Sequence, residues 1–184
     1  MKYIFDFDDV LFHTTKRRKE HLFPFLERAG IARSDMEEYY KKALTGYSGY
    51  FSMKDLLRHF SLKEEFYEEI MRGSEKYINI ELIELVKKLE KGNCYIITYG
   101  DKEFQLDKIK RTSIAPLFSE IIVVQGSKKE AIEKIATLHK DEKVVFIDDK
   151  PHHFQDLDFT KYPNLKTILY DEQGLEKLKS VIDH

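Results

Sequence analysis

The sequence of 184 residues contains a single cysteine, Cys94. One thiol cannot form an intrachain disulfide, and it cannot supply the paired cysteines of a zinc ribbon. Because Cys94 lies within an apolar run, we expect it to be a small residue of the core.

Long apolar runs and an excess of positive charge are also missing. No stretch approaches the about 18–20 apolar residues of a membrane span, and the chain turns acidic at Asp6, so it lacks the apolar region of a signal peptide. The 31 Lys and Arg are balanced by 33 Asp and Glu, a net charge of −2, whereas general nucleic-acid and anionic-membrane binders need a basic excess. We therefore expect a cytoplasmic protein with no nucleic-acid or membrane partner.

Two common nucleotide-binding motifs are absent as well. The sequence has no P-loop lysine motif and no glycine-rich dinucleotide fingerprint, which argues against an ATP-driven kinase or an NAD enzyme. Its 42% hydrophobic and 35% charged residues exclude intrinsic disorder and are enough for a core under a well-solvated surface.

Short apolar runs rich in Val, Ile and aromatic residues do occur along the chain. They span residues 3–5, 94–97, 121–124, 144–147 and, more weakly, 165–169. Such runs are typical of strands buried on both faces in a parallel sheet. Helical patterns at 104–111, 128–138 and 174–182 alternate with the later runs, which predicts an α/β fold with a Rossmann-like, doubly wound parallel sheet.

The interval between the first two runs is purely helical in pattern. Helices are expected near 15–29, 34–44, 53–60, 63–76 and 80–91, the first of them kinked or starting late because of Pro24. A crossover needs only about a dozen residues, so most of this interval reads as an insertion. We predict a core of residues 1–12 and 80–184 with an α-helical insertion at 13–79.

Polar residues follow each of the first four apolar runs. In an open α/β sheet, ligands bind beyond the carboxyl ends of the strands. In chain order the candidates are Asp6, Asp8 and Asp9, then Thr98 with Tyr99 and Gly100, then Lys128 or Lys129, then Asp148 and Asp149. Each one taken singly is common as a turn former or helix cap, but acids from two strand ends with a lysine between them suit a divalent metal and a bound anion.

The chemistry of these residue types points to phosphoryl groups. Asp6 and Asp8 are two positions apart and face the same side of an extended chain, and their repulsion favours different protonation states. An ionised carboxylate can attack phosphorus to form an aspartyl-phosphate. Lys128 at a helix start would place positive charge near phosphate oxygens.

These residues resemble the motifs of the haloacid dehalogenase (HAD) superfamily. The run Asp6-Phe7-Asp8-Asp9-Val10-Leu11 is similar to its first motif, Thr98 to the second, Lys128 to the third, and the acidic end of 145–149 to the fourth. The helical insertion lies where this family has its C1-type cap.

The resemblance implies a role for each residue. Asp6 would be the nucleophile and a metal ligand, and Asp8 the general acid/base with its backbone carbonyl on the metal. Thr98, Tyr99, Gly100 and Lys128 would bind the substrate and its phosphoryl group, and Asp148 and Asp149 would complete a Mg²⁺ site. The presence of Asp8 favours a phosphatase acting on a small phosphorylated metabolite over a dehalogenase.

Several alternatives stay open at this point. The chain could be a phosphomutase or a HAD-fold binding or regulatory protein without turnover, and a monomer or a cap-mediated dimer. Lys129 could replace Lys128, although Lys128 leaves Ile132 and Ile135 facing inward. We expect the basic run 16–19 to be a solvated helix face, with an anion-attracting cleft face as the alternative. His152 and His153 read as surface or helix-start residues, and the aromatic stretch 47–51 as lining a cleft or packing the helices.

Overall fold

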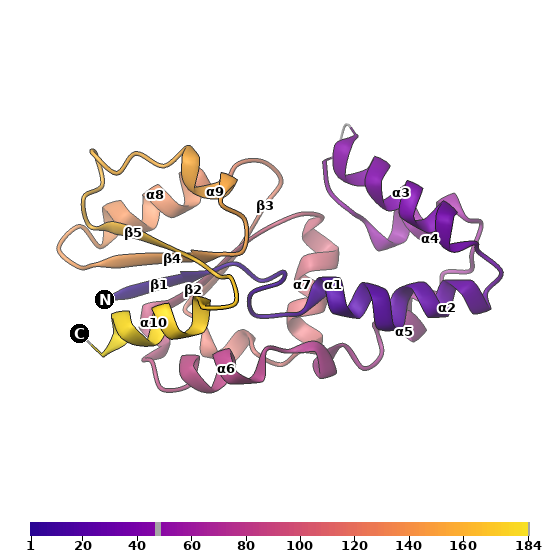
Figure 1. Ribbon diagram of the computed structural model, residues 1–184, viewed down its shortest axis with the longest axis horizontal. Helices are drawn as coiled ribbons and strands as arrows, with labels where there is room; N and C mark the ends of the chain where they lie inside the picture. The colour runs from indigo at the N-terminus through magenta and orange to yellow at the C-terminus, as the bar shows by residue number, and fades with distance from the viewer. Residues whose placement is uncertain (47–48, 184) are drawn as a thin grey trace.

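The computed structural model describes residues 1–46 and 49–183. Its centre is one parallel sheet with the strand order β3-β2-β1-β4-β5, which confirms the predicted α/β class (Figure 1). The strands are β1 (Lys2–Phe5), β2 (Cys94–Tyr99), β3 (Glu120–Val124), β4 (Val144–Asp148) and β5 (Leu165–Leu169).

Helices cover both faces of the sheet and bury alternate strand residues. On one face α6 (Ile80–Val86), α7 (Lys102–Arg111) and α10 (Gly174–Ile182) pack over one apolar cluster, and on the other α8 (Lys129–Leu138) packs over a second. Ile4 and Phe5 are fully buried and belong to different clusters, one for each face. This period of two is what a strand covered on both sides requires.

The two edge strands depart from the prediction that all the runs are buried on both faces. In β3 the first residue is exposed and the next four are half-buried, and in β5 Lys166 is exposed while Thr167 and Leu169 are half-buried. Each of these strands lies at an edge of the sheet, where it pairs with a single neighbouring strand.

Five helices form a separate group beside the sheet, which we call the helical lobe (Figure 1). They are α1 (Thr14–Arg17), α2 (Phe23–Arg28), α3 (Arg33–Thr45), α4 (Met53–His59) and α5 (Phe66–Met71). Their apolar side chains form a third cluster, which includes Phe104 of α7. The lobe is tied to α7 by polar contacts as well, such as the hydrogen bond from Tyr67 to Asp107 at 2.8 Å.

The helices differ from the predicted ranges at two places, near Pro24 and at Gly73. Between α1 and α2 the chain forms a π-helical turn, η1 (Arg18–Leu22), directly before Pro24; proline lacks an N–H and crowds the preceding turn, and a wider turn accommodates it. The expected helix at 63–76 is divided by Gly73, whose φ of 74° favours glycine. The short 3₁₀ turns are η2 (Ser74–Tyr77), η3 (Lys91–Asn93) and η4 (Ala115–Leu117), and α9 is His152–Gln155.

Cys94 opens β2 and is fully buried, as expected. Burial raises the pKa of its thiol to about 12, so the reactive thiolate is scarce at neutral pH. We expect native protein at pH 8 to react with a thiol-specific disulfide reagent at least about 100-fold more slowly than protein in denaturant. Comparable rates in the two conditions would show that β2 is open to solvent.

Among the described residues, no helix combines the length and the apolar character that crossing a bilayer requires.

Candidate active site

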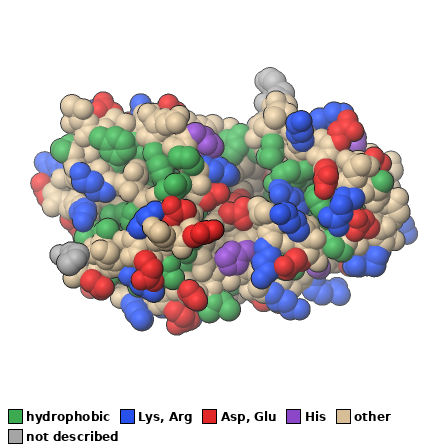
Figure 2. Space-filling model, in the orientation of Figure 1, with side chains coloured by type: hydrophobic (Ala, Val, Ile, Leu, Met, Phe, Trp, Pro, Cys, Tyr) green, Lys and Arg blue, Asp and Glu red, His purple; other side chains and the backbone are tan. Residues whose placement is uncertain are grey.

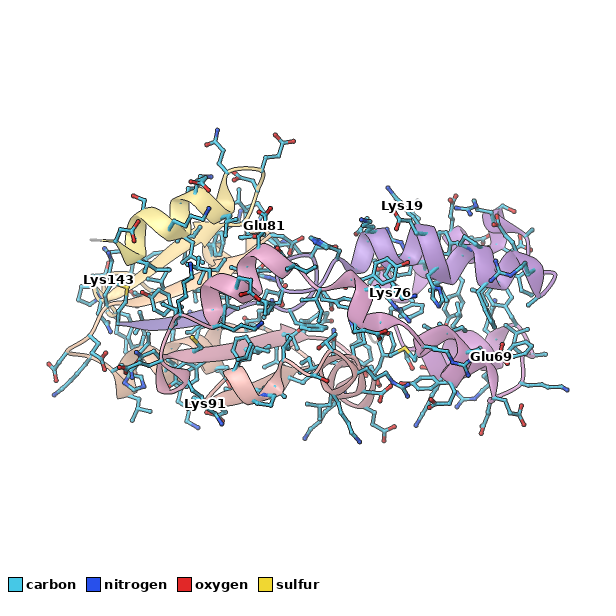
Figure 3. The ribbon with its side chains drawn as sticks, turned by 90° about the horizontal axis from the view of Figure 1, so that it is seen from below. Lys19, Glu69, Lys76, Glu81, Lys91 and Lys143 are labelled. Atoms are coloured by element: carbon cyan, nitrogen blue, oxygen red, sulfur yellow. The ribbon has the colours of Figure 1, made fainter. Side chains whose placement is uncertain are left out.

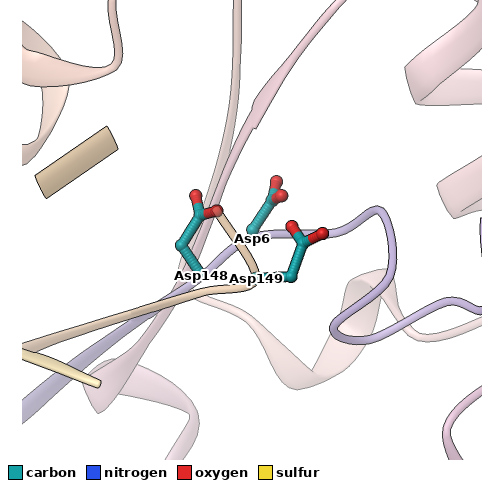
Figure 4. A group of neighbouring side chains, drawn as sticks. All are labelled: Asp6, Asp148 and Asp149. Carbon is teal, nitrogen blue, oxygen red and sulfur yellow. The ribbon is translucent and has the colours of Figure 1, made fainter. Parts of the chain in front are cut away.

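Three carboxylates meet at the carboxyl end of the sheet. Asp6 follows β1, Asp148 ends the adjacent strand β4, and Asp149 comes next (Figure 4). One oxygen from each lies within 4.8 Å of one from each of the others. The parallel register explains this convergence, since Phe5 pairs with Ile147 and brings the two strand ends level.

Lys128 inserts its ammonium group between two of these carboxylates. It precedes α8 as its N-cap residue, is 2% exposed, and its Nζ lies 2.8 Å from Asp6 Oδ1 and 2.7 Å from Asp148 Oδ2. The side chain of Lys129 is 41% exposed, and its one ion pair among the described residues is with Glu133, at 3.8 Å. Of the two lysines that the sequence left open, the structure places Lys128 at the carboxylates.

The three carboxylates differ in their ionisation. Burial raises the pKa of Asp6, and Lys128 offsets this only in part. Burial also raises the pKa of Asp149, to about 6. At Asp148 burial acts in the same direction, but hydrogen bonds from His153 and Lys128 outweigh it and hold the pKa at about 2.

This arrangement fits a hard divalent cation. Lys128 pairs with two of the three carboxylates, and the charge of Lys150 acts on the third, Asp149. The cluster still has an excess of negative charge in a buried setting, which is unfavourable without further compensation. The buried Oδ1 of Asp149 has no hydrogen-bond partner among the described residues. Carboxylate oxygens at such spacing are the ligands that Mg²⁺ prefers.

Thr98 lies on the neighbouring strand β2, and its hydroxyl group is buried. The residue is fully buried, and within the described part of the chain its Oγ1 has no hydrogen-bond partner. A buried hydroxyl without a partner is costly, and an incoming anionic oxygen would satisfy it.

Gly100, just beyond β2, must be a glycine in this fold. It has a φ of 147°, and a Cβ atom there would come within 2.8 Å of Gln105 Nε2. Its backbone therefore lets Gln105 approach, and Gln105 in turn donates a hydrogen bond to the Tyr99 carbonyl at 2.8 Å.

Asp8 lies outside the three-carboxylate group and has partners of its own. Its carboxylate accepts hydrogen bonds from Lys108 at 2.5 Å, from Gln105 at 2.7 Å and from Thr14. Burial raises the pKa of Asp8, but the charge and hydrogen bond of Lys108 outweigh that effect, and the pKa is lowered.

Lys108 was not among the residues that the sequence analysis singled out. It is 2% exposed and lies on α7 one turn after Phe104, which belongs to the apolar cluster of the helical lobe. A lysine four positions after a core aromatic residue, on the same helix face, is the signal that could have identified it.

His153 was predicted to be a surface or helix-start residue, and it lies at the start of α9 (His152–Gln155). It is not a surface residue, because its side chain is only 16% exposed and its Nδ1 lies 2.8 Å from Asp148 Oδ2. The prediction considered imidazole only as a metal ligand, whereas His153 contacts a carboxylate of the cluster. Its neighbour His152 is exposed, as expected.

A cleft of about 120 Å³ lies between the sheet and the helical lobe, and Asp8 forms part of its wall. Asp6 is not part of the lining, whereas Asp8, two residues after Asp6, and Lys150, next to Asp149, are. Figure 2 shows acidic side chains gathered on this face where the two parts of the molecule meet. The lining also includes Tyr50 and Phe51 of the predicted aromatic stretch, and the predicted substrate-binding pair Tyr99 and Gly100; residues 47 and 48 of that stretch lie outside the described residues.

The basic run 16–19 divides between solvent and this cleft. Lys16 and Lys19 are exposed, as predicted for a solvated face. Arg17 is 4% exposed, and both Arg17 and Arg18 line the cleft, so the expectation of a wholly solvated face is wrong. The helix turns these two side chains toward α3 and α5 rather than away from the molecule.

Comparison with known proteins gives matches of structure only. No protein-family model and no curated protein matches the sequence. A haloacid dehalogenase-like hydrolase from Burkholderia xenovorans LB400 matches with a TM-score of 0.72 and 16% identity over 95% of this chain and 89% of that chain.

Two further solved structures cover nearly the full length of both chains. The HAD-hydrolase YfnB from Bacillus subtilis, whose magnesium-bound crystal form is described as revealing interdomain movement, has a TM-score of 0.59 and 18% identity over 100% of this chain and 98% of that chain. A protein named as a beta-phosphoglucomutase from Thermotoga maritima has a TM-score of 0.59 and 16% identity over 98% and 100%. The chain therefore has the fold of HAD-superfamily proteins.

Proposed function

We propose that this protein is a Mg²⁺-dependent phosphatase of the HAD superfamily that hydrolyses a small phosphorylated metabolite through an aspartyl-phosphate on Asp6. The observation that carries the proposal is the cluster of Asp6, Asp148 and Asp149 at the carboxyl end of a HAD-type sheet, with Lys128 between Asp6 and Asp148.

The residues that would hold Mg²⁺ are Asp6, Asp148 and Asp149, with the backbone carbonyl of Asp8. The unpartnered oxygen of Asp149 supports this assignment. When bound, the ion would offset the repulsion between the carboxylates and an anionic phosphate.

In the first step, a carboxylate oxygen of Asp6 attacks phosphorus. The bond between phosphorus and the ester oxygen breaks, and a proton from Asp8 neutralises the departing alkoxide. Lys128 and Thr98 donate hydrogen bonds to the phosphoryl oxygens as charge shifts onto them. Because Lys108 holds the pKa of Asp8 low, this donation requires that Asp8 leave Lys108 or receive its proton from the substrate's phosphate.

In the second step, Asp8 acts as a base. It takes a proton from a water molecule that attacks phosphorus, and the bond between phosphorus and Asp6 breaks to release inorganic phosphate. The carboxylate form that Lys108, Gln105 and Thr14 maintain is the form that this step needs.

The helical lobe would act as the cap predicted for residues 13–79. Its helices form the far wall of the cleft, so substrate bound there would be shielded from water during the first step. The side chains of this wall would select the leaving group.

The direct experiment measures phosphate release from para-nitrophenyl phosphate and a panel of phosphorylated metabolites, with Mg²⁺ and with EDTA. Release that requires Mg²⁺ is expected. A folded protein that releases no phosphate from any compound would favour the binding-protein alternative, and conversion of a sugar phosphate into its isomer without release would favour a phosphomutase.

We expect His153 to affect Mg²⁺ affinity without contacting the ion. Its hydrogen bond lowers the pKa of Asp148, and residues that orient metal ligands typically contribute about 10–100-fold to affinity. His153→Ala should therefore raise the calorimetric Kd for Mg²⁺ at least about tenfold. His152→Ala, at the exposed neighbouring position, is the matched control, and equal Kd values for the two variants would exclude this role.

A further inference from the structure

Arg17 is a buried cation without an acidic partner. It is 4% exposed, and in the described part of the chain no carboxylate forms an ion pair with it. Its Nη2 donates a hydrogen bond to the Ile70 carbonyl at 2.6 Å and lies 3.3 Å from Met71 Sδ, while its buried Nε has no partner. Buried charges are normally paired, whereas no carboxylate of the described residues is in direct contact with this guanidinium.

Arg17 lies where a bound molecule could supply that charge. Its side chain lines the cleft between the sheet and the helical lobe, on the same wall as Arg18. The guanidinium of Arg18 stacks on the ring of Tyr40, 4.1 Å from the ring centroid, which holds it against the cleft. Two fixed arginines thus lie on the lobe side, and Asp8 lies on the sheet side.

The other charges of the cleft do not neutralise this pair. The carboxylate of Asp8 is engaged by Lys108 at 2.5 Å, and that of Asp9 accepts hydrogen bonds from Thr15 at 2.7 and 2.8 Å. Lys150 adds a further cation to the lining, on the sheet side next to Asp149. The lobe side of the cleft is basic because of Arg17 and Arg18, and the carboxylate cluster is acidic.

We propose that Arg17 and Arg18 form a second anion site, and that the substrate is a phosphate monoester whose alcohol part carries another anionic group, a carboxylate or a second phosphate. The inference rests on the proposed function, because the phosphoryl group would lie at Asp6 and the second anion beyond Asp8. Guanidinium groups suit both anions, since their planar donors match carboxylate and phosphate oxygens.

A purely structural role for Arg17 accounts for only part of its environment. The hydrogen bond to Ile70 links α1 to α5 through Nη2, but a neutral donor could make that link. A structural role leaves the buried Nε of Arg17 without a partner. It also does not explain why Arg18 lines the same cleft.

The test compares phosphate esters in pairs, in each of which one member carries a second anionic group and the other has an uncharged group in its place. Carboxymethyl phosphate is paired with carbamoylmethyl phosphate, 4-carboxyphenyl phosphate with 4-carbamoylphenyl phosphate, and propane-1,3-diyl bisphosphate with 3-hydroxypropyl phosphate. We expect wild-type kcat/KM to favour the charged member of at least one pair by tenfold or more. The carboxylate and bisphosphate pairs distinguish the two kinds of anion.

Variants of the two arginines test whether Arg17 and Arg18 cause the preference for the charged ester. Arg17→Gln and Arg18→Gln should each reduce the ratio of the two kcat/KM values at least fivefold. Lys19→Gln is the control, because Lys19 lies on the same helical run but points away from the molecule (Figure 3), and it should leave the ratio unchanged. Arg18 is only half-buried, so its variant keeps the test valid should Arg17→Gln fail to fold.

The outcomes separate this inference from the proposed function. Equal hydrolysis of both members of every pair, or a preference that survives in Arg18→Gln, would overturn the second anion site and leave the phosphatase intact. If no ester is hydrolysed, thermal unfolding with each ester present replaces kcat/KM. A higher Tm with the charged member, lost in Arg18→Gln, would support the anion site without phosphatase activity, and equal Tm values would overturn it.

Discussion

Asp6→Asn is expected to abolish turnover and leave the fold intact. The amide cannot attack phosphorus, and loss of a nucleophile typically lowers kcat by about 10³-fold or more. Stability should not fall, because Asp6 is one of three mutually repelling carboxylates and its pKa is already raised by burial. Phosphate release under Mg²⁺ and the circular dichroism spectrum are the two measurements.

Asp158→Asn is the matched control for this variant. It makes the same change of charge at an exposed carboxylate, which accepts hydrogen bonds from the backbone N–H groups of Thr160 and Lys161 and belongs neither to the cluster nor to the cleft lining. We expect activity within about threefold of wild type, and equal losses in the two variants would remove the special role of Asp6.

Lys128→Met is expected to destabilise the Mg²⁺-free protein strongly. Its ammonium group is the shared partner of Asp6 and Asp148, and removing one partner of a buried ion pair costs about 3–5 kcal/mol. Urea unfolding in EDTA at pH 7 measures this loss. Activity should fall together with stability, because the same group is proposed to bind the phosphoryl oxygens.

The loss in Lys128→Met should shrink as the pH is lowered. Without the lysine, burial and mutual repulsion raise the folded-state pKa of Asp6 above its unfolded value. A group of this kind binds more protons in the folded state, so stability falls as pH rises through its unfolded pKa toward the folded one. A loss of stability that is the same at pH 5 and pH 7 would contradict the assignment.

Lys129→Met provides the comparison. Its side chain is 41% exposed and makes one long contact, to Glu133 at 3.8 Å, so we expect a change within about 0.5 kcal/mol. If Lys129→Met were the more damaging of the two, the third-motif lysine would have been assigned to the wrong residue.

The sheet was predictable because its signals are local. Runs such as 94–97 and 144–147 are apolar without a break, and the structure confirms them as buried strands with the expected parallel pairing. The polar residues that follow them had to converge, since the ends of parallel strands meet at one edge of a sheet. That convergence brought Asp6, Asp148 and Lys128 together in the structure.

Contacts made by tertiary packing could not be predicted in the same way. The partnership of Lys108 with Asp8 joins residues 100 positions apart, and no local pattern records it. Arg17 and His153 are charged or polar residues in polar stretches, where a solvated position is the usual outcome. Their burial depends on how the helical lobe and α9 lie against the sheet, which sequence periodicity does not specify.

The most direct test of the account is to trap the covalent intermediate on Asp6. In Asp8→Asn the first step with para-nitrophenyl phosphate should still proceed, because para-nitrophenolate leaves without a proton, while the second step lacks its base. Borohydride reduction of the acid-quenched protein converts an aspartyl-phosphate to homoserine, which peptide mass spectrometry locates. We expect a burst of about one para-nitrophenol per chain, with homoserine at position 6. A burst without that modification, or with it at another residue, would contradict the proposed mechanism.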